Sequence, residues 1–230
     1  MKITQDFILS GRKNRPMTNP ASSLYNKKAV HKWITIHNAY SPGWGAKRLH
    51  EYVKSVACAN RPASWHFSID EKEVYQALPL DESGWHAGDY KSVANPGKGN
   101  TQSIGIEICD YAMIQKPPDE ALFWQGVDHA ARLCAHLIKT VPTLLTFPEC
   151  LKQHNHWSGK NCPSFIRAKQ GGWQEFIDMV GVHLNEKPPV SNTWYRVIVG
   201  SYRDKQNADM MVRKLSGMGF RGVFIDVKKD

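Results

Sequence analysis

Length, composition and charge narrow the classes of protein to which this chain can belong. Its 230 residues, 41% of them hydrophobic, are enough for one good-sized domain with a packed core, or for one domain and a small second one. The net charge of +9 favours an anionic partner such as nucleic acid, an anionic membrane or a cell-wall polymer. Because the basic residues alternate with acids and form no long run, the pattern disfavours nucleic acid.

The cysteines and the N-terminal residues indicate the cellular compartment in which the protein is made. The five cysteines are irregularly spaced and contain no C-x-x-C pair, which argues against a disulfide framework and favours a reducing compartment. Residues 1–7 are polar where a signal peptide has an apolar run. No stretch approaches the ~18 apolar residues that a membrane-spanning helix needs. We therefore expect cytoplasmic synthesis without a signal peptide, and no insertion into a membrane.

The apolar pattern predicts strands that alternate with helices. Residues 1–30 are polar and interrupted by glycine and proline, so we expect an irregular lead-in there. The pattern then predicts a buried strand at 33–36, a helix at 46–57 and a hairpin of strands at 65–70 and 74–78. Residues 79–102 are expected to form a loop, and a loop of this length is usually functional or mobile. After it the pattern predicts a strand at 103–109, a long helix at 119–140 and a final helix at 173–184. Such alternation indicates a mixed α/β fold.

A change of composition marks a domain boundary near residue 186. Residues 186–192 hold two prolines among polar residues, which is typical of a linker. Residues 193–230 then predict a strand at 195–199, a helix at 205–215 and a strand at 222–227, a βαβ unit too small to bury a full core by itself. The chain therefore divides into a domain of residues 1–185, a linker and a small C-terminal module.

The stretch from His154 to Pro163 contains the residue types of a zinc site. His154 and Cys162 lie eight residues apart around Gly159, and a neutral imidazole and a thiolate are ligands that Zn²⁺ takes. His37, at the end of a predicted strand, is the best third candidate. Three protein ligands leave the fourth tetrahedral position for a water molecule, which the metal makes acidic. Spacing alone leaves open a surface loop with a buried thiol.

Two further side chains would complete a hydrolytic site if they faced that metal. Glu107 alternates with the isoleucines of its predicted strand and so lies on the opposite face from them. It could form a salt bridge with a nearby cation, or it could take a proton from the metal-activated water and return it to a leaving amine. Lys160 could stabilise a developing oxyanion, or it could be an ordinary solvated lysine of a loop.

Five short segments follow one another along about residues 20–180. They are Ile34–Asn38, Ser64–Asp70, Gly84–Gly88, Ser103–Cys109 and His154–Pro163. In this order they resemble the zinc-dependent N-acetylmuramoyl-L-alanine amidases of the type-2 amidase family, which is related to phage T7 lysozyme and the peptidoglycan recognition proteins. The resemblance points to the prophage and endolysin type of Gram-positive bacteria. Five ordered motifs are far more specific than any one of them.

The resemblance implies a fold, a metal site and a reaction. The implied fold is a central mixed β-sheet flanked by helices, with the zinc in a surface groove. The implied ligands of one Zn²⁺ per chain are His37, His154 and Cys162, with Glu107 as catalytic acid and base and Lys160 as stabiliser of the transition state. The implied reaction is hydrolysis of the amide between the lactyl group of N-acetylmuramic acid and L-alanine in peptidoglycan.

Two positions depart from the pattern of that family. Part of the family has a catalytic tyrosine where this chain has Trp65, which lacks a phenolic hydroxyl, so Glu107 must carry more of the catalysis. Family members often have an aspartate two residues after the second ligand, where this chain has His156. This histidine could orient a ligand as a hydrogen-bond acceptor, or it could be a fourth ligand.

Three side chains in the matching segments are candidates for substrate binding. His66 and His86 could contact the muramyl or peptide group, or they could hold their loop through hydrogen bonds. Trp85 could stack on a sugar ring or close the groove.

The C-terminal module also resembles a known type of domain. Residues 194–202, Asn207-Ala208 and Gly219-Phe220 resemble a SPOR-like cell-wall-binding repeat, which implies binding to peptidoglycan. Because only one βαβ half of a full SPOR domain is present, two chains could pair their halves into a homodimer. Residues 186–230 hold nine Lys or Arg and five Asp or Glu, and this net charge of +4 favours anionic wall polymers as further partners.

The leading hypothesis is a cell-wall-lytic zinc amidase of the endolysin or autolysin kind, made in the cytoplasm and acting on the wall after release. The alternative is a non-catalytic peptidoglycan-binding receptor on the same fold. Such receptors typically lose the cysteine ligand, whereas this chain has Cys162 together with Glu107 and Lys160. A nucleic-acid-binding protein would need a basic stripe with interleaved aromatic residues, and the sequence shows none.

Overall fold

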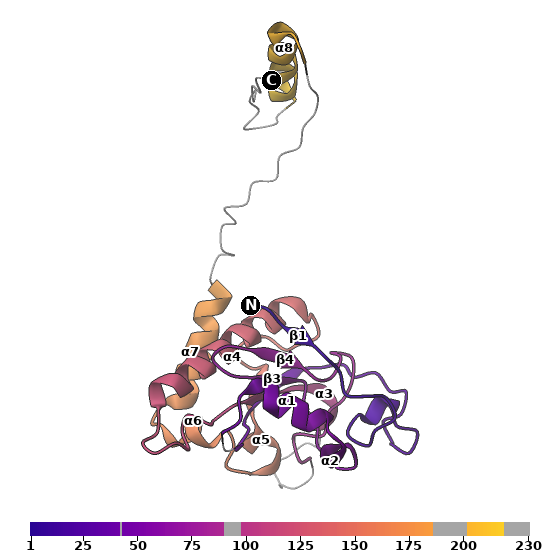
Figure 1. Ribbon diagram of the computed structural model, residues 1–230, viewed down its shortest axis with the longest axis vertical. Coiled ribbons are helices and arrows are strands. Elements are labelled where there is room, and N and C mark those ends of the chain that lie inside the picture. Colours follow the sequence, from indigo (N-terminus) through magenta and orange to yellow (C-terminus); the bar gives the residue numbers. More distant parts are fainter. Residues whose placement is uncertain (42, 90–97, 186–201, 219–230) are drawn as a thin grey trace. The chain divides into compact units, whose positions relative to one another are not determined.

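The chain forms two compact units, Met1–Glu186 and Lys187–Asp230. The computed structural model describes residues 1–41, 43–89, 98–185 and 202–218 (Figure 1). The predicted linker and the two predicted strands of the C-terminal module lie outside the described residues; they are 186–192, 195–199 and 222–227.

A mixed sheet forms the centre of the first unit. Within the described ranges its six strands lie in the order β1-β4-β3-β5-β2-β6. They are β1 (Thr4–Gln5), β2 (Trp33–Asn38), β3 (Phe67–Ile69), β4 (Val74–Gln76), β5 (Ser103–Ile108) and β6 (Leu151–Gln153). β2 pairs in parallel with β5 and β6, whereas β3 and β4 form the predicted antiparallel hairpin. The carboxyl ends of β2, β5 and β6 therefore meet at one edge of the sheet, where α/β folds commonly place their sites.

The two faces of β2 and β5 have different chemistry. Ile34 and Ile36 pair in register with Ile104 and Ile106, and all four side chains are fully buried. Because side chains alternate along a strand, the residues between them project from the other face. On that face His37 is paired in register with Glu107. One face of the sheet thus builds the core and the other carries the polar residues of the candidate site.

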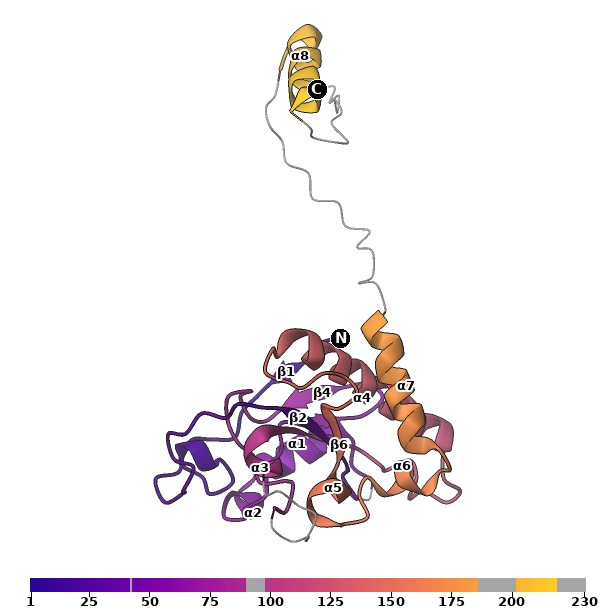
Figure 2. The ribbon, with the colours of Figure 1, turned by 180° about the vertical axis from the view of Figure 1, so that it is seen from behind.

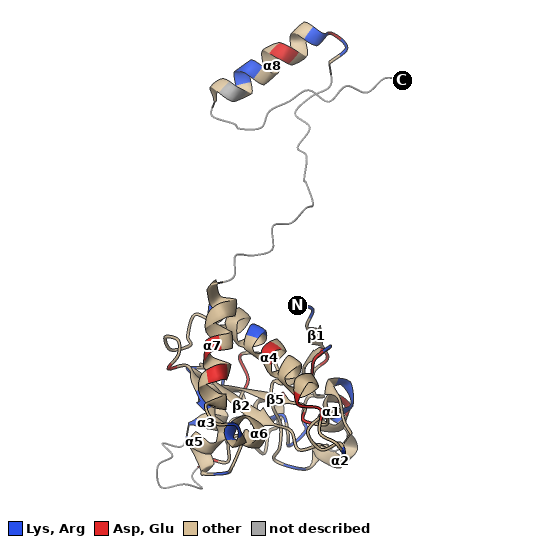
Figure 3. Ribbon diagram, turned by 90° about the vertical axis from the view of Figure 1, so that its left-hand side faces the viewer, with Lys and Arg blue, Asp and Glu red and all other residues tan. Residues whose placement is uncertain are grey.

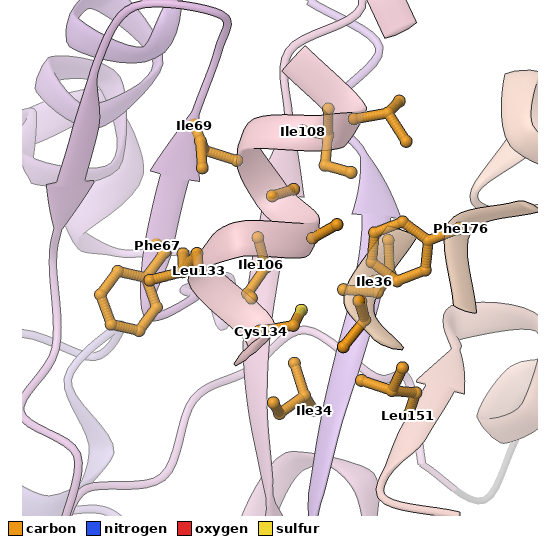
Figure 4. Packing of buried hydrophobic residues seen from close by; sticks show 14 of the residues in the cluster. Ile34, Ile36, Phe67, Ile69, Ile106, Ile108, Leu133, Cys134, Leu151 and Phe176 are labelled. Atoms are coloured by element: carbon orange, nitrogen blue, oxygen red, sulfur yellow. The ribbon is translucent and has the colours of Figure 1, made fainter. Parts of the chain in front are cut away.

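Two long helices cover the isoleucine face. They are α4 (Glu120–Thr140) and α7 (Gly172–Asn185), which pack against each other. α4 begins after Asp119, whose carboxylate accepts a hydrogen bond of 2.9 Å from the Leu122 amide. Figure 4 shows Leu133 and Cys134 of α4 and Phe176 of α7 against the isoleucines. The predicted α/β fold, a central mixed sheet flanked by helices, is confirmed.

A smaller hydrophobic cluster lies under α1 (Ala46–Lys54), which packs on β3 and β4. Leu49 and Val53 of this helix are buried together with Cys58 and Leu78. The predicted helix over 46–57 is wrong at its end. Ser55 has an extended backbone and its hydroxyl accepts from the Cys58 amide, so it caps a second helix, α2 (Val56–Ala59).

Several short elements differ from the predicted pattern. The irregular lead-in contains β1 and a 3-10 helix at Pro16–Thr18, and the predicted loop at 79–102 ends in α3 (Gly99–Gln102). β6 and the two helices that follow it, α5 (His154–Ser158) and α6 (Ser164–Ala168), were not predicted (Figure 2). Elements of two to five residues are too short for the repeat of apolar residues along a strand or helix to be recognised in the sequence.

The core on the isoleucine face should dominate the stability of the first unit. Ile106→Ala removes a fully buried side chain between β5 and α4, and we expect the free energy of unfolding to fall by about 2–5 kcal/mol. Val182→Ala, on α7 with 61% of Val182 exposed, is the control and should change it by less than about 0.5 kcal/mol. Denaturant unfolding measures both; equal effects of the two substitutions would contradict this assignment of the core.

The second unit contains, among its described residues, the helix α8 (Lys205–Gly217). The helix predicted over 205–215 is confirmed and ends two residues later. Its half-buried apolar residues share one face at helical spacing; they are Ala208, Met211, Val212 and Leu215. Figure 3 shows basic and acidic residues alternating along α8. No helix in the described part of the chain combines the length and the apolar character needed to cross a bilayer.

Candidate metal centre

Three buried side chains meet at the carboxyl ends of β2 and β6. His37 lies in β2, His154 follows β6 directly as the first residue of α5, and Cys162 follows α5. Their potential ligand atoms lie within 4.8 Å of one another. Nδ1 of His37 is 3.0 Å from Nδ1 of His154 and 3.9 Å from Sγ of Cys162. The three residues singled out from the sequence are thus brought together, and they could hold a metal ion.

The donor set fits a tetrahedral metal such as zinc. Zinc bonds of about 2.0–2.1 Å to nitrogen and about 2.3 Å to sulfur put two nitrogens roughly 3.4 Å apart and a nitrogen and a sulfur roughly 3.6 Å apart. The observed 3.0 and 3.9 Å differ from these separations by less than about half an ångström. Burial lowers the pKa of His37, so this imidazole is neutral, as a ligand must be. Burial also raises the pKa of the Cys162 thiol to about 12, so its thiolate needs a neighbouring cation.

Asn155 holds the turn that brings Cys162 back to His154. Its backbone amide donates to the Cys162 carbonyl at 2.9 Å. Its side-chain amide donates to the carbonyls of Gly159, at 3.0 Å, and Lys160, at 2.9 Å. Gly159 has φ of 74°, in the left-handed region that favours glycine. Asn155 was not among the residues singled out from the sequence; the available signal was an asparagine four residues before a glycine.

Glu107 lies beside the three candidate ligands, and one of its oxygens has no hydrogen-bond partner in the described part of the chain. Oε1 is 3.7 Å from Nδ1 of His37, whereas Oε2 is buried without a hydrogen-bond partner among the described residues. Burial raises the pKa of this carboxyl to about 8, and the charge of Lys160 acts in the opposite direction. No Lys or Arg of the described ranges forms an ion pair with Glu107, so the salt-bridge alternative has no support there.

Lys160 and His156 lie on the same segment but in different surroundings. Lys160 is exposed, and its charge lowers the pKa of both Glu107 and Cys162, which puts it within electrostatic reach of the site. His156 is also exposed and lines a separate hollow of about 300 Å³ together with Arg167 and Trp173. Within the described residues His156 is not part of the group of potential ligands.

The remaining candidates make hydrogen bonds inside the protein. The indole N–H of Trp65 donates to the Ser68 hydroxyl at 2.8 Å, and that of the half-buried Trp85 donates to the Lys13 carbonyl at 3.2 Å. His66 is fully buried; its Nδ1 accepts from the Gly105 amide at 3.0 Å.

His86 is 8% exposed, and its ring contacts His37. Substrate contact by His66, Trp85 or His86 stays a prediction.

All five cysteines lie in the described residues, and all are buried and free. The absence of a disulfide framework is therefore confirmed for them. Burial raises the pKa of each thiol, to about 11 for Cys150 and about 12 for Cys162. Because the thiolate is the reactive form, we expect an aromatic disulfide reagent to titrate none of them rapidly in the native protein and all five after unfolding. Rapid reaction of a native thiol would contradict this packing.

Comparison with known proteins matches both parts of the chain to families. Residues 26–165 match the family described as N-acetylmuramoyl-L-alanine amidase, and residues 180–226 match the SPOR domain. The N-acetylmuramoyl-L-alanine amidase CwlH of Bacillus subtilis (strain 168) is 35% identical over 190 residues, which cover 81% of this chain and 63% of that protein. XlyA of the same organism is 34% identical over 181 residues, which cover 79% of this chain and 52% of that protein. The chain thus spans less than two thirds of the length of these relatives.

Solved structures give the same result for the fold. The catalytic domain of XlyA superposes with a TM-score of 0.60 and 32% identity, over 79% of this chain and 100% of that domain. The PlyG catalytic domain superposes with a TM-score of 0.62 and 25% identity, over 82% of this chain and 99% of that domain. Fold, family match and the grouped side chains agree: the chain belongs to the N-acetylmuramoyl-L-alanine amidase family and carries a SPOR domain at residues 180–226.

Proposed function

We propose that this protein is a zinc-dependent amidase that cleaves peptidoglycan between N-acetylmuramic acid and L-alanine. The observation that carries the proposal is the meeting of two imidazoles and a thiol beside a buried oxygen of the Glu107 carboxyl group that has no partner in the described residues. That set supplies a metal site and a proton acceptor in one place. The curated relatives CwlH and XlyA are named as enzymes of this kind, which supports the same activity here.

Each residue of the site has a separate task in this reaction. His37, His154 and Cys162 would hold Zn²⁺, which when bound supplies an acidified water and an electrophile for the scissile carbonyl. Glu107 takes the proton of the attacking water and returns it to the leaving amine nitrogen of L-alanine. Lys160, whose side chain is exposed, stabilises the negative charge that develops on the lactyl carbonyl oxygen.

A non-catalytic peptidoglycan-binding receptor on the same fold is the second candidate. It needs neither a thiolate ligand nor a general base. The buried position of Cys162 next to both histidines is hard to account for in such a receptor, because a buried thiol that only fills space needs no imidazole partner. The amidase is therefore favoured.

Digestion of purified Gram-positive sacculi separates the two candidates. The amidase should release new L-alanine amino termini without new reducing sugar ends, and a zinc chelator should abolish the release. Firm binding to sacculi without new termini would support the receptor. New reducing ends would mean that the scissile bond is glycosidic.

We further propose that the C-terminal module directs the enzyme to the wall after its release from the cytoplasm. The SPOR match and the net charge of +4 over residues 186–230 support contacts with peptidoglycan and with anionic wall polymers such as teichoic acids. Pull-down on sacculi with and without teichoic acid measures the two contributions. Equal binding of the full chain and of residues 1–185 would remove this role from the module.

The single βαβ half predicted for the module supports a homodimer in which two chains complete one sheet. Two catalytic domains on one polymer would then gain avidity. Size-exclusion chromatography with light scattering tests this, and a monomer at every micromolar concentration would contradict it.

A further inference from the structure

His86 connects the candidate ligand His37 to the backbone of β5. Nε2 of His86 lies 3.2 Å from the Ser103 carbonyl oxygen, and its Nδ1 lies 3.1 Å from Nε2 of His37. A carbonyl oxygen can only accept, so Nε2 of His86 carries a proton. A neutral imidazole carries a single N–H, so with the proton on Nε2 the Nδ1 atom of His86 has none and accepts from Nε2 of His37.

The donor and acceptor roles in these two hydrogen bonds decide which nitrogen of His37 carries the proton. Because Nδ1 of His86 accepts, Nε2 of His37 must donate, and a neutral His37 then has its lone pair on Nδ1. Nδ1 is the atom that lies 3.0 Å from Nδ1 of His154 and 3.9 Å from Sγ of Cys162. The two hydrogen bonds that link the Ser103 carbonyl, His86 and His37 thus leave a lone pair on Nδ1 of His37, where the three ligand atoms meet.

We propose that His86 is a positioning residue that fixes the tautomer and the orientation of His37 for metal binding. The inference rests on the proposed metal site and assigns His86 a task other than contact with the substrate. A metal-bound histidine commonly donates a hydrogen bond from its second ring N–H to a carboxylate, a carbonyl or water. Here a second histidine takes that place and passes the hydrogen bond on to the backbone.

The surroundings of His86 are built to hold its ring. The side-chain oxygen of Asn100 accepts from the backbone amides of His86, at 2.8 Å, and Ala87, at 2.7 Å. Asn100 is itself held by Asp89, whose carboxylate accepts from the backbone amide of Asn100 at 2.9 Å. A Cβ atom at Gly105 would lie 2.7 Å from Cγ of His86, which is too close. The His86 ring therefore packs against the backbone at a position where only glycine leaves room for it. The predicted long loop at 79–102 therefore delivers a second histidine to the candidate centre.

Two amide side chains at position 86, each of which matches the position of one ring nitrogen, separate this role from simple packing. The oxygen of an asparagine side chain takes the place of Nδ1, so His86→Asn can still accept from His37. In His86→Gln the side-chain amide lies further from the backbone, near the position of Nε2 of the histidine. No acceptor is then left at the position of Nδ1. We expect His86→Gln and His86→Phe to weaken zinc binding by about 10–100-fold and His86→Asn to restore most of it. Zinc affinity is measured by competition with a chelating dye, with the melting temperature of each metal-free variant as the control for folding.

Gly105→Ala tests the same role from the other side of the ring. It leaves every hydrogen-bonding group in place but displaces the His86 ring, and it should weaken zinc binding as much as His86→Phe. Equal affinities for the Asn, Gln and Phe variants, with all of them folded, would overturn the role of His86 and leave the metal site itself intact.

Nitrogen-15 NMR of the metal-free protein gives a readout that does not depend on metal binding. His37 should show a protonated Nε2 and an unprotonated Nδ1 in the wild type and in His86→Asn. In His86→Phe the signals should show exchange between the two tautomers. A wild-type protein that shows this tautomer but binds no zinc would defeat the proposed function alone, whereas a proton on Nδ1 of His37 would defeat the inference about His86.

Discussion

Glu107→Gln should lower kcat on peptidoglycan by about 10²–10⁴-fold while the protein still binds zinc. The amide has nearly the shape of the carboxyl group but cannot take a proton from the attacking water. Because Oε2 of Glu107 is buried without a partner in the described residues, the substitution breaks no hydrogen bond of that atom. The loss of rate should therefore reflect the lost proton transfer and not a damaged fold.

The control for this substitution is Glu149→Gln. Glu149 is exposed, and the same chemical change there should leave kcat unchanged. The assay counts new L-alanine termini under zinc saturation, and metal content is measured in the same samples. If Glu107→Gln kept a wild-type kcat with zinc bound, another group would have to be the base.

Cys162→Ser should lower the affinity for zinc by more than about 100-fold and remove activity at low free zinc. Loss of a residue that hydrogen-bonds to a metal ligand already lowers metal affinity by about 10–100-fold, and loss of a ligand itself should lower it further. A serine hydroxyl would have to ionise to replace the thiolate, in a place where burial already raises the pKa of the thiol to about 12. The measurement is zinc affinity by dye competition, followed by the rate at several zinc concentrations.

Cys58→Ser is the matched control for Cys162→Ser. Cys58 is buried in the cluster under α1, where its thiol donates to the Ala63 carbonyl at 3.6 Å, and it is not part of the candidate ligand group. This variant should bind zinc as tightly as the wild type. Equal zinc affinity of Cys162→Ser and the wild type would remove Cys162 from the ligand set.

The central sheet could be predicted where strands are long enough to show their period. In β5 the alternation of isoleucines with Gly105 and Glu107 told which face Glu107 would occupy, and the register with β2 bears this out. The edge strands β1 and β6 have two and three residues, so their hydrophobicity carried no comparable signal. The place of β6 matters for the site, because His154 follows it directly.

The candidate site could be predicted only in part, for a physical reason. Residue types suggested His37, His154 and Cys162, but spacing along the chain does not say that Asn155 folds the turn back on itself. The contact between His86 and His37 depends on how the loop at 79–102 packs on Gly105. No local pattern encodes such a contact, which is why the sequence left His86 open between substrate binding and a structural role.

Cleavage of a defined muramyl peptide in oxygen-18 water tests the central claim most directly. Hydrolysis of the lactyl amide puts one heavy oxygen into the carboxylate of the muramic acid product and leaves unlabelled L-alanine at the new amino terminus of the peptide. Mass spectrometry should find this pair of products with the zinc-loaded protein and neither of them after chelation. A muramic acid product that keeps L-alanine, or label in a new reducing sugar end, would contradict the amidase mechanism.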